Sequence, residues 1–273
     1  MKFLIPTDFS QLSKIAIQYA IGLSKDFELD LVLLHIINTN TPAMARIGSQ
    51  KLEEAIKTSS EREMNELLNT LKKESSHNLN ISAKIIFGAS IAKAVEAFAL
   101  KHNIDMICIG TKGATGLKKI IFGSNAAGII ANSSIPVITV PEYAKYNGIS
   151  NIVYSSDLEN LEEELKLIIP FAKLMNTWIS ILHITNEYEG FNENLQREEN
   201  RLRTLFSHKK IKTKELKNDS VIKGINQYVA DIDADMVAMF TRRASLFEKL
   251  FNKSVTKKAA FQTKTPLLTF QKE

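Results

Sequence analysis

Short apolar runs alternate with longer amphipathic stretches along the first half of the chain. The run at residues 29–37, LDLVLLHII, is almost entirely apolar, as expected of a parallel strand that is covered on both faces. Between such runs, apolar residues recur every three or four positions, as from Leu52 to Leu71, which predicts amphipathic helices. By this pattern the strands are residues 3–5, 29–37, 81–88, 104–110 and 136–140. The alternation predicts an α/β domain with a parallel sheet.

The same pattern begins again after a polar stretch at residues 141–150. The segment NIVYSSD at residues 151–157 matches KFLIPTD at residues 2–8, and the triplet Leu-His-Ile at residues 34–36 returns at residues 182–184. Further on, the segment that begins with DMVAMFTRRA at Asp235 aligns without a gap with the segment that begins with DMICIGTKGA at Asp105. The chain is therefore an internal duplication, which predicts two domains of ordinary size, at residues 1–145 and 148–273.

Composition narrows the class of protein. Of the 273 residues, 44% are hydrophobic and 24% are charged, which is typical of a globular protein with a buried core. The apolar start of the chain is too short for a secretory signal, and no apolar run approaches the roughly 20 residues of a membrane-spanning helix. Cys108 is the only cysteine, lies in the apolar run Met-Ile-Cys-Ile, and is expected to be a small buried residue. We therefore expect a cytoplasmic protein with no membrane segment.

The positive net charge does not by itself indicate a nucleic-acid partner. The chain has a net charge of +5 and a pI near 9.1. However, lysines alternate with glutamates in helix-like stretches such as residues 51–73, and the basic run at residues 209–212 contains no aromatic residue. This arrangement is typical of solvated helix faces, so we expect no nucleic-acid binding.

Three glycines, Gly110, Gly113 and Gly123, carry the main chemical signal. Gly110 ends a predicted strand, while Gly123 and Ser124 open a predicted helix, at the sheet edge where open α/β folds bind ligands. Glycine leaves backbone N–H groups accessible, and a helix N-terminus favours an anion. The spacing therefore predicts a loop that holds phosphates. The alternative is that these glycines only form turns.

This pattern resembles the universal stress protein family, whose ATP-binding members carry G-x2-G-x9-G-[S/T]. Gly110, Gly113, Gly123 and Ser124 match that pattern. The segments Pro-Thr-Asp at residues 6–8 and Leu-His-Ile at residues 34–36 are also similar to the family. The resemblance covers the whole chain as a tandem pair, more strongly in the first half. It implies two doubly wound α/β domains, each with a five-stranded parallel sheet in the order 3-2-1-4-5 and helices on both faces.

The resemblance also implies a ligand, ATP, accompanied by magnesium in one interpretation, and a set of residues that contact it. The residues implied to border adenine and ribose are Thr7, Asp8 and Ile36. The residues implied to hold ribose and phosphates are Ile109, Gly110, Gly113, Gly123, Ser124 and Asn125.

Several of these residues have a structural alternative. Asp8 precedes a predicted helix cap, Ser10, so it could be a turn residue as well as a ligand contact. Ile36 would be a core residue in either case. His35 returns as His183 in the second half, which favours a hydrogen-bonded structural role over a chemical one.

The second half departs from the glycine pattern. In the gapless overlay, Gly110 becomes Phe240, Gly113 becomes Arg243 and Gly123 becomes Lys253, while Asp157 matches Asp8. Side chains would then stand where the backbone has to approach phosphate. We therefore predict that the second domain does not bind ATP. Its basic residues could bind another anion, although a solvated cluster is the simpler interpretation.

The sequence leaves three functions open. The first is a cytoplasmic stress-response regulatory protein that binds ATP in its N-terminal domain. The second is an interaction scaffold without a nucleotide. The third is a slow ATPase in which Asp8 activates a water, although the sequence indicates no catalytic residue and no metal-ligand cluster.

The resemblance finally implies an arrangement of the two halves. Family dimers commonly pair their last strands, so residues 137–140 and residues 267–270 are expected to pair within this chain. A further homodimer is left open.

Overall fold

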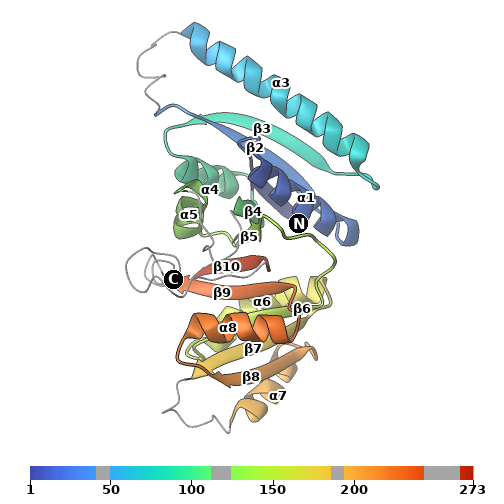
Figure 1. The fold of residues 1–273 in the computed structure, drawn as a ribbon, viewed down its shortest axis with the longest axis vertical. Helices are drawn as coiled ribbons and strands as arrows, with labels where there is room; N and C mark the ends of the chain where they lie inside the picture. The colour runs from blue at the N-terminus through green and yellow to red at the C-terminus, as the bar shows by residue number, and fades with distance from the viewer. Residues whose placement is uncertain (41–49, 112–123, 186–193, 243–264, 273) are drawn as a thin grey trace. The chain divides into compact units, whose positions relative to one another are not determined.

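A computed structural model describes residues 1–40, 50–111, 124–185, 194–242 and 265–272 of the chain. The described residues form two compact units, with the elements of residues 1–145 in the first and those of residues 146–272 in the second (Figure 1).

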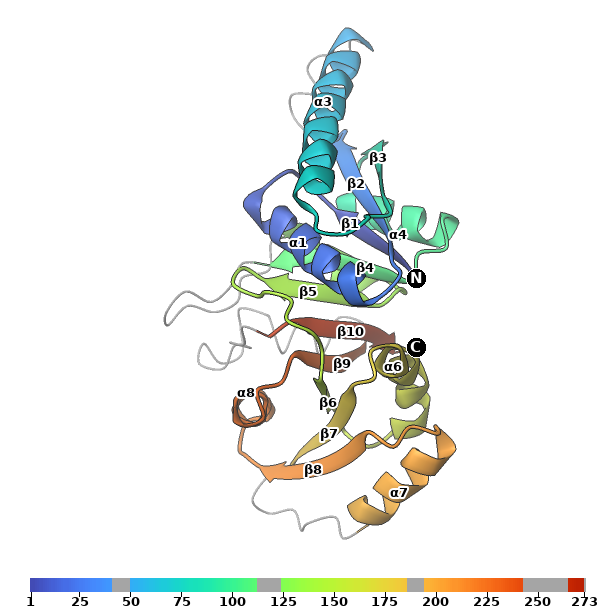
Figure 2. The ribbon, with the colours of Figure 1, turned by 90° about the vertical axis from the view of Figure 1, so that its right-hand side faces the viewer.

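The first unit is a five-stranded parallel sheet in the order β3-β2-β1-β4-β5. Helices α1 and α3 lie on one face of this sheet, and helices α4 and α5 pack together on the other (Figures 1 and 2). The strands are β1 (Lys2–Pro6), β2 (Asp30–Asn38), β3 (Ile81–Gly88), β4 (Met106–Thr111) and β5 (Val137–Pro141). The helices are α1 (Gln11–Asp26), α3 (Gln50–Glu74), α4 (Ile91–Lys101) and α5 (Ser124–Asn132).

The second unit repeats this topology with parallel strands in the order β8-β7-β6-β9-β10. Helices α6 and α7 lie on one face of the sheet and helix α8 lies on the other (Figure 2). The strands are β6 (Asn151–Ser155), β7 (Trp178–Thr185), β8 (Ile211–Lys217), β9 (Met236–Arg242) and β10 (Leu267–Lys272). The helices are α6 (Leu161–Leu174), α7 (Leu195–Leu205) and α8 (Val221–Asp231). The predicted fold class, two tandem doubly wound domains, is confirmed.

Equivalent residues of the two units make equivalent hydrogen bonds. The Asp105 carboxylate accepts from the backbone N–H of Lys2 at 2.7 Å, and the Asp235 carboxylate accepts from that of Asn151 at 2.9 Å. The His35 Nδ1 donates to the backbone oxygen of Thr7 at 2.8 Å, and the His183 Nδ1 donates to that of Ser156 at 2.9 Å. These repeated contacts confirm the structural role predicted for the two histidines.

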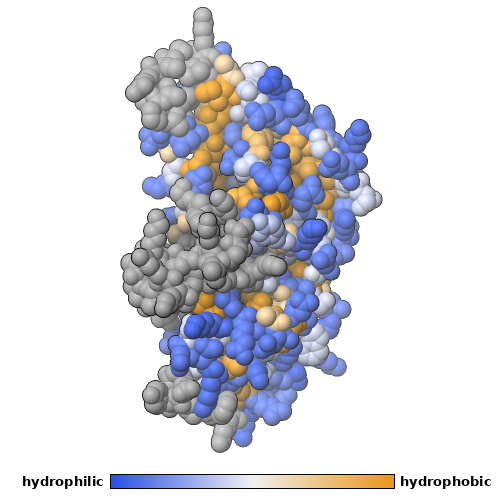
Figure 3. Space-filling model, in the orientation of Figure 1, coloured by the Kyte–Doolittle hydropathy of each residue, from blue (hydrophilic) through white to orange (hydrophobic). Residues whose placement is uncertain are grey.

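The cores are apolar and the surface is mostly polar. Cys108 is fully buried on β4, where burial raises the pKa of its thiol to about 12, so it is the small neutral core residue that its sequence context predicts. On the face shown in Figure 3, hydrophilic residues surround smaller hydrophobic areas. None of the helices in the described ranges combines the length and the apolar character that a membrane crossing needs.

The two units differ in the contact between the first strand and the first helix. In the second unit, the buried hydroxyl of Tyr154 on β6 donates a hydrogen bond to Glu164 on α6, which is also buried. In the overlay of residues 2–8 on residues 151–157, the first unit has Ile5 in place of Tyr154. Burial, with the Glu164 hydrogen bond adding to it, raises the pKa of Tyr154, so the phenol stays protonated and acts as a donor to the carboxylate.

Replacing Tyr154 by phenylalanine is expected to destabilise the second unit. The substitution keeps the ring but removes a donor from a buried carboxylate, which costs about 1–3 kcal/mol. Urea unfolding of Tyr154→Phe should show a lower midpoint than the wild type. The matched control Tyr143→Phe, at an exposed tyrosine, should unfold like the wild type. Equal midpoints for all three proteins would contradict the interpretation.

Candidate functional site

A cavity of about 220 Å³ opens at the carboxyl edge of the first sheet, where β1 and β4 lie side by side. The chain leaves these two strands for helices on opposite faces, which is the switch point where open α/β sheets bind ligands. Residues from the β1 loop, from β2 and β4, and from the starts of three helices line the cavity. They are Pro6, Thr7, Asp8, Ser10, Leu12, Ser13, Leu34, Ile36, Ile91, Ile109, Gly110, Asn125, Ala126 and Ile129.

The loop after β1 is held in shape by hydroxyl groups. The Thr7 Oγ1 accepts from the backbone N–H of Phe9 at 3.0 Å and lies 2.9 Å from the Ser13 Oγ. The backbone N–H of Thr7 donates to Leu34 of β2 at 2.9 Å. Phe9 has a φ of 63°, in the left-handed region, and its ring packs on His35 with 4.5 Å between ring centroids. These contacts fix the backbone on both sides of Asp8.

Asp8 is both a turn residue and a cavity residue. Its Oδ1 accepts from the backbone N–H of Ser10 at 3.1 Å, and Ser10 in turn caps α1 by accepting from the N–H of Ser13 at 3.3 Å. Partial desolvation acts to raise the pKa of Asp8, but the hydrogen bonds from Ser10 and the backbone together outweigh it and hold the pKa below its ordinary value. The carboxylate is therefore ionised at neutral pH and is an acceptor for ligand hydroxyl groups.

Gly110 allows α1 to approach β4. A Cβ at this position would lie 2.0 Å from the backbone oxygen of Leu12, so any other residue would push the start of α1 away from the sheet. The sequence placed Gly110 at the end of a strand, and in the structure it is the second-last residue of β4, at the cavity wall. Its close approach to the start of α1 was not predicted.

Six of the predicted ligand residues line the cavity. They are Thr7, Asp8, Ile36, Ile109, Gly110 and Asn125. Ser124 begins α5, whereas Gly113 and Gly123 lie outside the described residues. The contact of any of these residues with a nucleotide stays a prediction.

Sequence reasoning missed most of the apolar wall. Leu34, Ile91 and Ile129 line the cavity from β2, α4 and α5. A signal was available for two of them. Ile91 follows Ser90, a residue type that favours helix starts, and Ile129 lies four residues after Asn125, on the same side of a helix.

In the part of the chain that the structure describes, His, Cys, Asp and Glu side chains form no group of three that could hold a metal ion. Asp8 is the one ionisable side chain among the described residues that line the cavity. The described part of the site is therefore suited to hydrogen bonding and apolar contact.

The second unit repeats the loop after its first strand. Ser156 accepts from the backbone N–H of Leu158 at 3.0 Å, Leu158 has a φ of 66°, and the Asp157 Oδ1 accepts from the N–H of Glu159 at 3.1 Å. These contacts match those of Thr7, Phe9 and Asp8. The duplication therefore preserved the loop that positions the acidic residue.

The second unit differs at the equivalent of Gly110, which is Phe240. The ring of Phe240 stacks on Phe270 with 5.0 Å between centroids and meets the edge of Tyr154 at 5.9 Å. A phenyl ring thus stands where the first unit has no side chain. The absence of an ATP site from the second half stays a prediction.

The comparisons with known proteins place the chain in a family. The model of the universal stress protein family matches residues 1–141. One universal stress protein of Methanocaldococcus jannaschii is 30% identical over 145 residues, which cover 53% of this chain and 84% of that protein. A second one from the same organism is 29% identical over 151 residues, which cover 51% of this chain and 93% of that protein.

A solved structure matches nearly the whole chain. The crystal structure of a universal stress protein from Archaeoglobus fulgidus covers 99% of this chain and 98% of its own, with a TM-score of 0.76 and 16% identity, which shows a shared fold. The family match itself rests on sequence and spans more than half of the 273 residues. The chain therefore belongs to the universal stress protein family.

Proposed function

We propose that the first unit binds ATP and that the chain acts as a cytoplasmic regulatory protein of the stress response. The observation that carries the proposal is the cavity at the β1–β4 switch point, which six of the predicted ligand residues line. Family membership and the G-x2-G-x9-G-S pattern of residues 110–124 support it.

The chemistry of the cavity favours the adenosine end of the nucleotide. Its volume of about 220 Å³ is below the roughly 300–1,000 Å³ of whole ligand pockets, so it fits a part of ATP. Ile36, Ile109 and Ile129 offer apolar contact to a flat base. The Asp8 carboxylate would accept hydrogen bonds from the ribose hydroxyl groups.

The same carboxylate sets the direction of the phosphates. A negative Asp8 repels phosphate, so the triphosphate would point away from the β1 loop and toward the start of α5. A helix N-terminus stabilises negative charge through its free N–H groups. In this pose, the side chain of Asn125, in the first turn of α5, would donate a hydrogen bond to a phosphate. Gly113, Gly123 and Ser124 would lie along the phosphates, as the resemblance implies.

The second unit serves a different purpose in this proposal. Phe240 takes the position of Gly110, and its ring packs on Phe270. The second unit lacks the three glycines of the family pattern, so in this proposal ATP binds in the first unit only. The unit would act by stabilising or transmitting the state of the first, with the last strands of the two units paired as the family resemblance implies.

Replacing Gly113 distinguishes an ATP-binding protein from an interaction scaffold that binds no nucleotide. Gly113→Arg installs the residue that the second half has at the equivalent position, and should abolish ATP binding in isothermal titration while the circular dichroism spectrum is unchanged. The mirror variant Arg243→Gly should bind like the wild type. A wild type that does not bind ATP would support the scaffold.

The two acidic loops provide a matched pair for a second test. Asp8→Asn keeps the acceptor for the Ser10 N–H but removes the charge, and should weaken ATP binding about 10-fold to 100-fold, as expected for the loss of a hydrogen bond to a charged group. Asp157→Asn makes the same change in the same kind of loop and should leave the dissociation constant unchanged. Equal effects of the two substitutions would contradict the assignment.

The lowered pKa of Asp8 predicts how the loss of ATP affinity in Asp8→Asn depends on pH. A carboxyl with a depressed pKa stays ionised until the pH falls below its ordinary value of about 4. The ratio of wild-type to Asp8→Asn affinity should therefore be constant from about pH 8 to pH 5 and decrease only below about pH 4. Using the ratio cancels the titration of ATP itself. A ratio that already declines between about pH 7 and pH 5 would show a raised pKa instead.

A further inference from the structure

Helices α1 and α3 of the first unit leave a groove between them, whose lining shares no residue with that of the cavity at the β1–β4 switch point. The groove has a volume of about 370 Å³, within the roughly 300–1,000 Å³ of ligand pockets. Phe9, Ile17, Leu67 and Leu71 form its apolar floor. Ile17 and Leu71 are buried, while Phe9 and Leu67 are half-buried. The groove therefore has the size and the apolar contacts to hold a small organic molecule.

The rim of the groove is acidic. Glu63, Glu66 and Glu74 of α3 line it with exposed side chains. Lys14 of α1 is the one cation among the described residues of the lining, so three carboxylates face one ammonium group. The three glutamates make no ion pair with any residue that the structure describes. The described lining thus has an excess of negative charge that a cationic ligand would balance.

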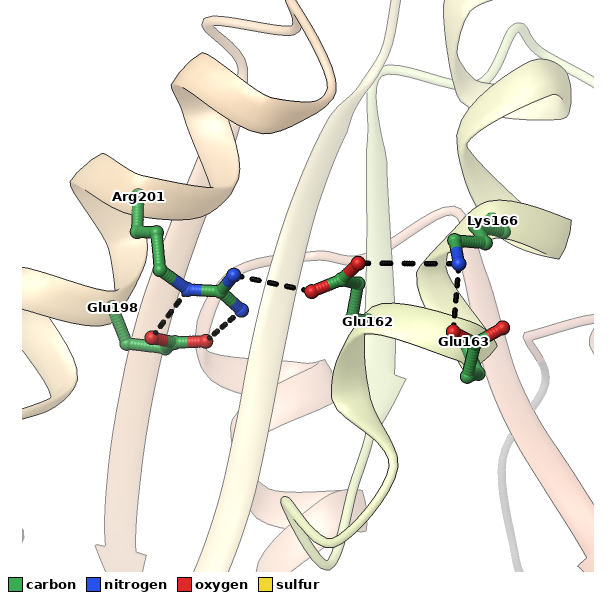
Figure 4. Close-up of polar contacts among 5 residues, drawn as sticks. All are labelled: Glu162, Glu163, Lys166, Glu198 and Arg201. Atoms are coloured by element: carbon green, nitrogen blue, oxygen red, sulfur yellow. Dashed lines mark hydrogen bonds and ion pairs between the residues drawn. The ribbon is translucent and has the colours of Figure 1, made fainter.

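The second unit pairs the charges of its equivalent helices within the chain. Arg201 of α7 contacts Glu162 of α6 at 3.1 Å, and Lys166 of α6 contacts Glu163 at 2.6 Å (Figure 4). In the overlay of the two halves, Lys166 takes the place of Ile17, so a charged side chain replaces part of the apolar floor. The combination of an apolar floor with carboxylates that have no ion-pair partner among the described residues is therefore a feature of the first unit.

We propose that the groove between α1 and α3 binds a small organic cation that carries an aromatic or alkyl body. The body would lie on Leu67 and Leu71, and the ammonium group would lie among the glutamates of the rim. The ring of Phe9 packs on His35 with 4.5 Å between centroids and also borders the groove. An aromatic face attracts an ammonium group, so Phe9 adds to the preference for a cation. The same carboxylates repel phosphate, which separates this site from that of a nucleotide.

Three matched probes test the proposal in an NMR titration of the full chain. Benzyltrimethylammonium carries a ring and a positive charge, tetramethylammonium carries the charge alone, and phenylmethanesulfonate carries the ring with a negative charge. Benzyltrimethylammonium should bind with a dissociation constant on the order of 1 mM, as expected for a ligand of this size. The other two should bind at least about fivefold more weakly, because each lacks one of the two contacts.

A charge variant locates the bound cation. Glu63→Gln with Glu66→Gln keeps the shape of the rim and should raise the dissociation constant of benzyltrimethylammonium about fivefold, as expected for two exposed charges. The matched control Glu53→Gln with Glu54→Gln changes two exposed glutamates of the same helix that lie outside the groove lining, and should bind like the wild type.

An aromatic variant tests the role of the ring. Phe9→Leu installs the residue of the equivalent loop in the second unit, where Leu158 has the same left-handed backbone, so the loop is retained. It should weaken the binding of benzyltrimethylammonium about threefold.

Three results would overturn the proposal. The first is a benzyltrimethylammonium affinity no greater than that of the other two probes. The second is an equal affinity in the wild type and the Glu63→Gln, Glu66→Gln variant. The third is binding that Asp8→Asn weakens and the rim variant does not, because Asp8 lines the switch-point cavity and the cation would then lie there.

Discussion

Helix α1 passes so close to β4 that a Cβ on Gly110 would lie 2.0 Å from the backbone oxygen of Leu12. The position of the first-unit cavity depends on this approach, because the cavity lies between the start of α1 and the ends of β1 and β4. The start of α1 brings Ser10 and Ser13 to the loop, and these residues hold Asp8 and Thr7 in place. One missing side chain thus permits both the packing of the helix and the shape of the site.

The second unit has the same architecture without a glycine at the position equivalent to Gly110. Its loop after the first strand retains the hydroxyl acceptor, the left-handed residue and the acidic turn of the first unit. At the strand that corresponds to β4, an aromatic cluster of Tyr154, Phe240 and Phe270 takes the place of the glycine contact. The loop is part of the fold and persists, whereas the glycine at the strand end is found only in the first unit. The duplicated halves are therefore free to take different roles.

Much of the fold followed from the sequence, because buried parallel strands and amphipathic helices have distinct hydrophobic periods. The run at residues 29–37 became β2, and the Leu52–Leu71 pattern lies within α3. The candidate site was partly predictable, since Asp8 and Gly110 come from segments that meet at a sheet edge. The role of Gly110 was not, because the approach of Leu12 depends on tertiary packing. Leu34 was missed for a similar reason, since its place in the cavity wall depends on how β2 lies beside the other elements.

We propose one nucleotide site per chain, in the first unit. Counting bound ATP tests it most directly, by equilibrium dialysis of the full-length protein at saturating ATP and magnesium. We expect one bound ATP per chain, and no bound ATP in a chain that carries Gly113→Arg. Two ATP molecules per chain, or one that persists in that variant, would contradict it.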